Sequence, residues 1–247
     1  MASGEESGAV SVLPQTAHLP AAGRCAESFP PVYRMLRVAC LPFLRIFFDL
    51  RVSGVEGLPA TGPFILAANH HNYLDGVVLG ACTPRPISFL VMPRVWNASP
   101  LHPPFHRQIG SIPITLERPD HGAIRRALRV LEAGGVIGIF PEGPFSHEGR
   151  LESGRPGAAL IALRSGVPVV PAAILGTYEA LVGRRFYVPR PHGLSVRFGH
   201  PLQFHPRYRR VTHSEREEAT GRIMREIAAL LEAEHGPASG RDKAGRS

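Results

Sequence analysis

Residues 64–81 carry the two signals that decide the fold, and they read FILAANHHNYLDGVVLGA. The apolar run at their start has the length of a buried strand, and the segment from Leu74 to Ala81 has the character of a helix. A dense polar group, Asn69 to Asp75, separates the two. A buried strand that leads directly into a helix is the repeating unit of proteins with a parallel sheet.

The same alternation of apolar runs and helical segments continues along the chain. Further strands are predicted at residues 87–92, 111–116, 136–140 and 167–174, helices at 120–133 and 156–165, and a short helix or irregular segment at 98–108. Asp120 is the expected cap of its helix, residues 194–199 alternate like an edge strand, and residues 213–235 predict a helix capped by Thr212 or Ser214. The predicted fold class is α/β: a single layered domain whose largely parallel central sheet is flanked by helices, plus an N-terminal amphipathic helix.

Four segments make up the predicted organisation of the chain. Residues 1–29 are rich in Ser, Gly, Ala and Pro and predict a disordered leader, residues 52–235 predict the globular domain, and residues 236–247 predict a polar tail. Residues 30–51 predict an amphipathic helix in which Leu, Met and Phe alternate with Arg. Such a helix either packs on the core of the domain or lies in a membrane interface, and the sequence leaves both open.

The composition predicts a globular and strongly basic protein. Of 247 residues, 44% are hydrophobic and 19% are charged, which provides enough apolar material for a sizeable core. The formal net charge is +8, and only Lys243 among the 28 basic residues is a lysine, which argues against a Schiff base or a P-loop. Seven Arg and no Asp or Glu lie between Ala180 and Ser214. This stretch is either a solvated face or a surface that attracts anionic lipid, an acidic carrier protein or nucleic acid.

Cysteine usage and the length of the apolar runs bound the cellular setting. Cys25, Cys40 and Cys82 are widely spaced without a C-x-x-C pair, which excludes a disulfide scaffold and a cysteine zinc site and favours a reducing, cytoplasmic setting. The most apolar stretch, residues 35–50, contains two Arg and is too short and too charged to span a bilayer. The first residues contain no visible secretory signal. We therefore expect a cytoplasmic protein that is soluble or lies on a membrane surface.

Two polar clusters at predicted strand ends are candidates for chemistry. A histidine that donates one ring N–H to a carboxylate keeps its other nitrogen free to accept a proton, so His70 and Asp75 form a candidate general base. These residues are five apart and meet only if the chain turns between strand and helix. Glu142 stands between Pro141 and Gly143 directly after a buried run, where a rigid turn would aim it at a cleft.

Each cluster also has a plainer interpretation. The first is a polar strand end without chemistry, and the second is an ordinary β-turn. His71 and Asp75 are spaced to share a helix face and to ligate a metal, but two ligands do not make a site. The sequence contains no G-x-S-x-G, H-E-x-x-H or Walker motif.

Taken together and in order, five blocks resemble the glycerolipid acyltransferases of the lysophosphatidate acyltransferase type. AANHHNYLDG resembles the first block of that family, Asn-His-x4-Asp, and FLVMPRVW is similar to its strand that ends in a basic residue, here Arg94. IGSIPITLER resembles the second block, FPEGPFS the third and VPVVP the fourth. The domain at residues 52–235 is therefore expected to be an acyltransferase domain.

The resemblance implies transfer of a fatty acyl group from acyl-CoA or acyl-carrier protein to a lysolipid hydroxyl, in the first place from 1-acylglycerol 3-phosphate to phosphatidate. His70 would be the general base and Asp75 would orient it, without a cofactor or a metal. The residues implied in substrate binding are Asn69, Arg94, Arg118, Phe140, Pro141, Glu142 and Gly143. The implied partners are the lysolipid, the acyl donor and an anionic membrane surface on the inner face of the cell membrane. No nucleic acid is expected.

Two departures from the family pattern concern the part of the site that should grip the acceptor phosphate. Leu116 stands where the second block has Arg, and Pro144 and Phe145 stand where the third block has Thr and Arg. A dianionic phosphate without charged donors is costly to desolvate. One of three arginines then substitutes, Arg118, Arg150 or Arg155. Otherwise the acceptor is another lysolipid, such as a lysophospholipid or an amino-acid lipid. A basic nucleic-acid-binding protein is the alternative from another class.

Overall fold

The computed structural model describes residues 30–115, 120–146, 148–181, 189–205 and 211–233. The predicted leader at 1–29, the predicted tail at 236–247, Arg118 and five of the seven arginines of the arginine-rich stretch lie outside these ranges. The division of the chain into four segments therefore stays a prediction.

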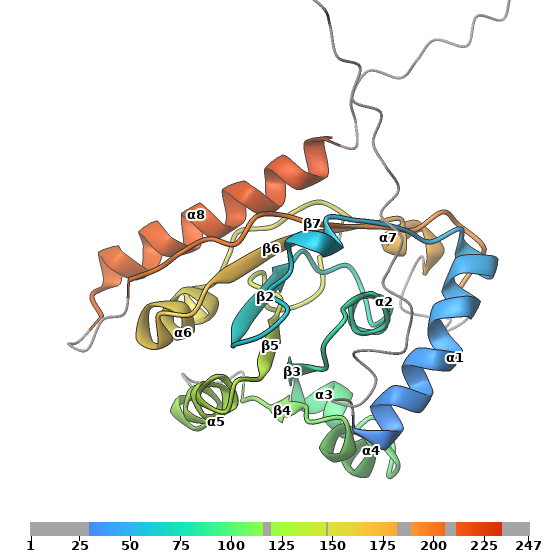
Figure 1. The fold of residues 1–247 in the computed structure, drawn as a ribbon, viewed down its shortest axis with the longest axis horizontal. Helices are drawn as coiled ribbons and strands as arrows, with labels where there is room; N and C mark the ends of the chain where they lie inside the picture. Colours follow the sequence, from blue (N-terminus) through green and yellow to red (C-terminus); the bar gives the residue numbers. More distant parts are fainter. Residues whose placement is uncertain (1–29, 116–119, 147, 182–188, 206–210, 234–247) are drawn as a thin grey trace, which may run out of the picture.

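A sheet of seven strands forms the middle of the molecule, in the order β1-β7-β6-β2-β5-β3-β4 (Figure 1). The strands are β1 Arg51–Ser53, β2 Phe64–Ala68, β3 Ile87–Val91, β4 Ile112–Pro113, β5 Val136–Ile139, β6 Val169–Leu175 and β7 Ser195–Phe198. The strands from β6 to β4 in this order all run in one direction, whereas β7 is antiparallel to β6 and β1 is parallel to β7. The predicted α/β class with a largely parallel sheet is confirmed.

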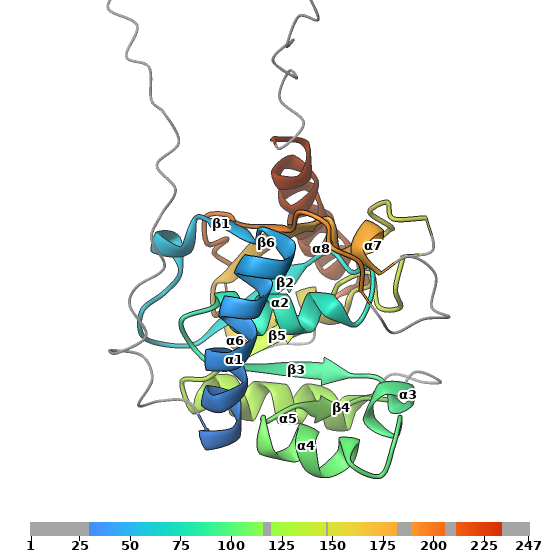
Figure 2. The ribbon, with the colours of Figure 1, turned by 90° about the vertical axis from the view of Figure 1, so that its right-hand side faces the viewer.

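Helices cover both faces of this sheet. They are α1 Pro31–Phe48, η2 Val55–Gly57, α2 Leu74–Cys82, α3 Pro93–Trp96, α4 His102–Gln108, α5 His121–Glu132, α6 Gly157–Ser165, α7 Thr177–Ala180 and α8 His213–Glu232. In Figure 1, α1 and α2 lie on one side of the sheet, and α5, α6 and α8 lie on the other. Figure 2 views the molecule from the side of α1, which lies in front of α2.

The central strand β2 holds the two layers together because it is buried on both faces. Successive side chains of a strand point to opposite sides. Phe64 and Leu66 accordingly join the apolar core under α1 and α2, while Ile65 and Ala67 join the core under α5, α6 and α8. The carboxyl end of β2, where the polar group begins, therefore lies in the middle of the fold.

Local capping signals in the sequence correctly located two helix starts. The side chain of Asp120 accepts a hydrogen bond from the main-chain N–H of Ala123 at 2.8 Å, which caps α5. Thr212 and Glu215 form a reciprocal capping box at the start of α8. These interactions involve only residues close in sequence, which is why the sequence predicts them.

The prediction of an edge strand at residues 194–199 is wrong. β7 lies between β6 and β1, so β1 and not β7 ends the sheet. β1 has only three residues and directly follows α1, which leaves too short a pattern for the sequence to reveal it. The strand predicted at 111–116 is limited, in the part of the chain that is described, to Ile112 and Pro113.

The N-terminal helix α1 presents two different faces. Tyr33, Leu44 and Phe48 are buried, and the main-chain N–H of Ile87 donates to the Tyr33 hydroxyl at 3.2 Å. On the outer face Ile46 is 86% exposed. The helix therefore packs on the core along one face and leaves the other uncovered. None of the helices within the described ranges combines the length and the apolar character needed to cross a bilayer.

Gly138 of β5 provides a test of how tightly the core is packed. A Cβ atom at this position would lie 2.5 Å from side-chain atoms of Ile87 and Phe89. We expect Gly138→Ala to lower the free energy of unfolding by about 1–3 kcal/mol through overpacking, measured by urea denaturation. Gly57→Ala, where a Cβ atom meets nothing within 4 Å, is the control and should change stability much less. Equal stability of the two variants would contradict this interpretation.

Candidate active site

Asn69 extends the pairing between β2 and β6 with its side chain. Its Nδ2 donates to the carbonyl of Ile174 at 2.8 Å, and its Oδ1 accepts the main-chain N–H of Ile174 at 2.7 Å. The amide group thus takes the place of a peptide group in the sheet, and Asn69 is fully buried. The structure uses this predicted substrate-binding residue to fix the point at which the chain leaves the sheet.

His70 and Asp75 converge directly after that point. His70 Nδ1 lies 2.8 Å from Asp75 Oδ2. The same carboxylate oxygen accepts the main-chain N–H groups of His71 at 2.6 Å and Asn72 at 2.8 Å, which bends the chain between strand and helix as the spacing required. Because Asp75 accepts at Nδ1, the neutral imidazole carries its hydrogen there and keeps Nε2 as a proton acceptor.

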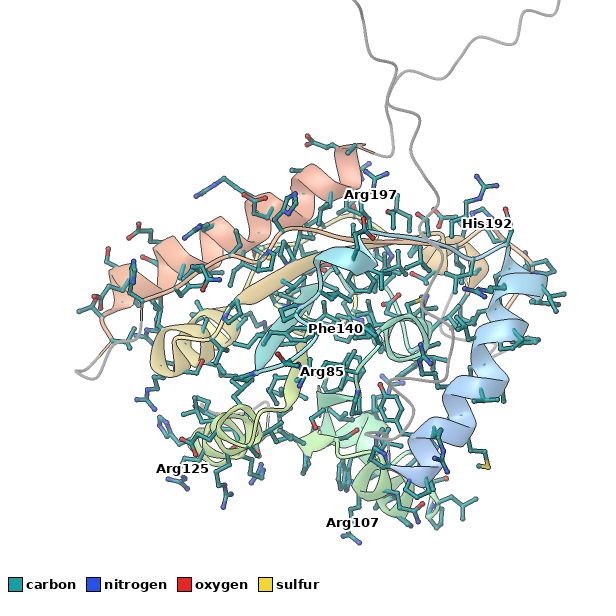
Figure 3. All side chains as sticks on the ribbon, in the orientation of Figure 1. Arg85, Arg107, Arg125, Phe140, His192 and Arg197 are labelled. Carbon is teal, nitrogen blue, oxygen red and sulfur yellow. The ribbon has the colours of Figure 1, made fainter. Side chains whose placement is uncertain are left out.

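Two aromatic rings hold the His70 ring in place. Phe140 stacks on it with ring centroids 3.7 Å apart and planes inclined by 6°, and Phe145 meets it edge-on at 4.4 Å. His70 as a whole is only 7% exposed. Figure 3 shows Phe140 in the interior of the molecule, whereas Arg107 and Arg125 point outward. The imidazole is therefore restricted to one orientation by its carboxylate and by packing.

Glu142 connects the His70 turn to the loop after β5. Its Oε1 accepts the main-chain N–H of His70 and its Oε2 accepts that of Glu152, both at 2.7 Å. The side chain is 2% exposed, and burial raises the pKa of this carboxyl group to about 7, against the lowering effect of the two main-chain donors. Both carboxylate oxygens of Glu142 thus accept hydrogen bonds from the main chain of the protein. In this geometry Glu142 positions the turn that carries His70.

An apolar cavity of about 260 Å³ opens beside His70. Its walls come from α1, α2, β3, α3, α4 and the loop after β5. Apolar lining residues include Leu36, Val77, Phe89, Val91, Val95, Ile109, Phe140 and Phe145. A hydrocarbon chain fits the chemistry of this lining, and a proton acceptor stands at its wall.

Sequence reasoning missed one polar residue of the site, Thr177. It is fully buried at the start of α7, and its carbonyl accepts from Asn72 Nδ2 at 2.6 Å while its hydroxyl lies 3.2 Å from His71 Nδ1. Thr177 follows β6 at its carboxyl end, on the strand next to β2. That position was the available signal, because polar residues that follow adjacent parallel strands meet at one edge of the sheet.

Of the other predicted substrate-binding residues, some lie at the site and Arg94 does not line the cavity. Pro141 and Gly143 belong to the turn that carries Glu142, since Gly143 donates its main-chain N–H to Phe140 at 3.0 Å. Arg94 is exposed on α3 and is not among the residues that line the cavity. Across the described ranges, no group of three or more His, Cys, Asp or Glu side chains is arranged to hold a metal ion.

Fold and site together define an α/β protein in which a carboxylate-bound histidine faces an apolar cavity. The family profile described as Acyltransferase matches residues 49–175. The chain is 30% identical over 146 residues to the 1-acyl-sn-glycerol-3-phosphate acyltransferase of Bacillus subtilis, which covers 56% of this chain and 70% of that protein. The chain is also 29% identical over 141 residues to the chloroplastic LPAT1 of Arabidopsis thaliana, a 1-acyl-sn-glycerol-3-phosphate acyltransferase. This aligned region covers 53% of this chain but only 37% of the relative.

A solved structure has the same fold. The crystal structure of the 1-acyl-sn-glycerophosphate acyltransferase PlsC from Thermotoga maritima superimposes with a TM-score of 0.66, at 22% identity, over 84% of this chain and 80% of that chain. The chain belongs to the acyltransferase family. The family membership predicted from the ordered motifs is confirmed.

The protonation state of His71 follows from its neighbours. The main-chain N–H of Ile174 bonds to Asn69 Oδ1, so the amide nitrogen of Asn69 is the atom that faces His71 Nε2, at 3.4 Å. Nε2 must therefore accept, and Nδ1 carries the hydrogen that bonds to Thr177 Oγ1. The pKa of His71 is lowered overall, chiefly because the ring is buried. The charges of Asp75 and Glu179 act in the opposite direction and raise the pKa, whereas His70 lowers it.

This arrangement predicts a loss of stability in acid. The unfolded chain binds a proton at His71 near pH 6.5, whereas the folded chain binds it only at lower pH, so the unfolded state gains protons first as the pH falls. A glutamine at this position offers an acceptor and a donor without titrating. We expect the free energy of unfolding of the wild type relative to His71→Gln to be constant above about pH 7.5 and to decrease below about pH 6.5. Urea denaturation at a series of pH values measures it, and a difference independent of pH would contradict the assignment.

Proposed function

We propose that this acyltransferase moves a fatty acyl group from a thioester donor, acyl-CoA or acyl-carrier protein, to the free hydroxyl of 1-acylglycerol 3-phosphate. The product is phosphatidate. The observation that carries the proposal is the 2.8 Å contact between His70 Nδ1 and Asp75 Oδ2 beside the apolar cavity. The Bacillus subtilis and Arabidopsis thaliana relatives are 1-acyl-sn-glycerol-3-phosphate acyltransferases, which supports the choice of acceptor.

His70 acts as the general base in this proposal. Its Nε2 removes the proton of the acceptor hydroxyl as the oxygen attacks the thioester carbonyl carbon, and Asp75 stabilises the imidazolium that forms. The tetrahedral intermediate then collapses, the carbon–sulfur bond breaks, and the imidazolium returns the proton to the leaving thiolate. The ester forms directly, so no acyl-enzyme intermediate is needed.

The apolar cavity takes the acyl chain of the donor. It borders His70 and Phe140, so a chain lying in it would present its thioester to the imidazole. Each methylene group buried in the cavity contributes about 0.8 kcal/mol to binding. Contacts with the apolar lining therefore supply most of the affinity for the acyl donor.

A second acceptor class has a specific observation in its favour. Phe145 is 6% exposed, contacts the His70 ring and occupies the position where the family pattern has Arg. An acceptor without a terminal phosphate, such as a lysophospholipid, would not require that cation. Competing acceptors under one donor discriminate the two, because a strong preference for lysophosphatidate eliminates the alternative.

Removing the base tests the proposed mechanism. We expect His70→Ala to lower kcat by at least about 10²-fold, and Asp75→Asn to lower it as well because the carboxylate no longer orients and balances the imidazole. Transfer of labelled acyl groups to lysophosphatidate measures both. His121→Ala, at the exposed start of α5, is the control. Near wild-type turnover by a folded His70→Ala variant would exclude the mechanism.

The outer face of α1 supports a peripheral position on an anionic membrane. Met35, Val38 and Ile46 are each more than 60% exposed, and Arg34 and Arg45 lie among them. A helix with apolar and basic exposed residues binds the surface of an anionic bilayer. In the cell we place this surface on the inner face of the membrane, where the lipid product is released.

Vesicle binding tests this placement. We expect Ile46→Glu to weaken binding to phosphatidylglycerol vesicles about tenfold, because it removes buried apolar area and adds a like charge. Ala133→Glu, which makes the same charge change at the exposed end of α5, should have little effect. Co-sedimentation at low and high salt measures both. Binding to DNA or RNA without binding to vesicles would favour the nucleic-acid alternative instead.

A further inference from the structure

The site has no cation at position 145, where the family pattern has Arg. Phe145 occupies this position, and its ring packs against the rings of His70 and Tyr73. A phosphate brought next to the imidazole therefore needs a positive group from elsewhere in the fold. The inference below rests on the proposed function, because it assumes an acceptor that carries a phosphate.

Arg155 is anchored to the turn that holds His70. Its main-chain N–H donates to the carbonyl of Pro141 at 2.7 Å. Its side chain lies over Gly143, since a Cβ atom built on that glycine would be 2.8 Å from Arg155 Nε and 3.3 Å from Cζ. Gly143 has a φ of +86°, a conformation suited to glycine, and the missing side chain leaves the space that the guanidinium group occupies.

The same turn fixes the catalytic histidine through two separate contacts. Phe140 at its start stacks on the His70 ring, and Glu142 accepts the main-chain N–H of His70. The 140–143 turn therefore contacts both Arg155 and the ring of His70. A group bound by the guanidinium would be held at a constant position relative to the imidazole.

We propose that Arg155 binds the phosphate of the lysolipid acceptor and thereby sets the preference for phosphate-bearing acceptors. The planar guanidinium group can donate two parallel hydrogen bonds to phosphate oxygens. Arg155 is exposed, and among the interactions of the described residues no carboxylate pairs with it. Its charge is therefore available to an anion from solvent.

The loop that positions His70 contributes apolar residues to the cavity and carries Arg155 outside the cavity lining. Phe140 and Phe145 line the apolar cavity, whereas Gly143 and Arg155 do not. An acyl chain in the cavity and a phosphate on Arg155 would therefore contact different residues of the loop that positions His70. This matches a reaction that joins an apolar donor chain to the hydroxyl of a charged acceptor.

Other arginines are less well placed for this part. Arg37 lines the apolar cavity from α1, on the side assigned to the acyl chain. Arg150 is exposed, and the contact it makes through its carbonyl is with Ser146 Oγ, at 2.7 Å. Arg94 is exposed on α3.

The test compares acceptors that differ by the phosphate alone. Initial rates are measured with one acyl donor and either lysophosphatidate or the uncharged monoacylglycerol, for the wild type, Arg155→Gln, Arg155→Lys and the control Arg164→Gln at the exposed end of α6. We expect Arg155→Gln to raise the KM for lysophosphatidate about 10–100-fold with little change in kcat, and Arg155→Lys to lie between it and the wild type. Arg164→Gln should match the wild type. The rate with monoacylglycerol should be the same in all four proteins.

Two results would overturn the proposal. One is an unchanged KM for lysophosphatidate in Arg155→Gln. The other is an equal loss with lysophosphatidate and monoacylglycerol, which would make Arg155 a structural residue of the turn. Failure of the proposed function looks different, because the wild type itself would then acylate another lysolipid and leave lysophosphatidate unused.

Discussion

One buried carboxylate determines the geometry of the site. Asp75 is fully buried, and its Oδ2 accepts three N–H groups, from the ring of His70 and from the main chain of His71 and Asn72. A single oxygen thereby bends the chain out of β2, supports the start of α2 and orients the imidazole. A buried anion is stable only when donors compensate its desolvation, so these three requirements are met together or not at all.

A second buried carboxylate adds the neighbouring segment to this arrangement. Glu142 bonds to the main chain of His70 and of Glu152, which joins the end of β2 to the loop between β5 and α6. Phe140 and Phe145 in the same loop then enclose the imidazole ring. The main-chain donors come from rigid elements, so His70 has little rotational freedom while it lines the cavity.

The proposed reaction requires apolar and polar surfaces to lie close together, and the fold supplies them at two scales. Around His70, Phe140 and Phe145 of the 140–145 turn line the cavity, whereas Arg155, which lies over Gly143, does not. Across the molecule, α1 packs on the core with Tyr33 and Leu44 and leaves Ile46 exposed. An enzyme acting on lipids would use the first division to sort the two ends of its substrates and the second to reach the bilayer that contains them.

The sequence by itself predicted most of the strands and helices, the caps at Asp120 and at the start of α8, the acyltransferase family and the candidate pair of His70 and Asp75. The elements, the caps and the pair depend on residues close together in the chain, where hydrogen-bond geometry and apolar periodicity are local, and the family follows from the order of short motifs along the chain. Only the tertiary structure decided that β1 ends the sheet, that Thr177 supports the His70 turn from 106 residues away, and that Arg155 lies over Gly143. Such contacts arise when parallel strands bring the ends of distant segments to one edge of the sheet, and no local pattern encodes which loops then meet.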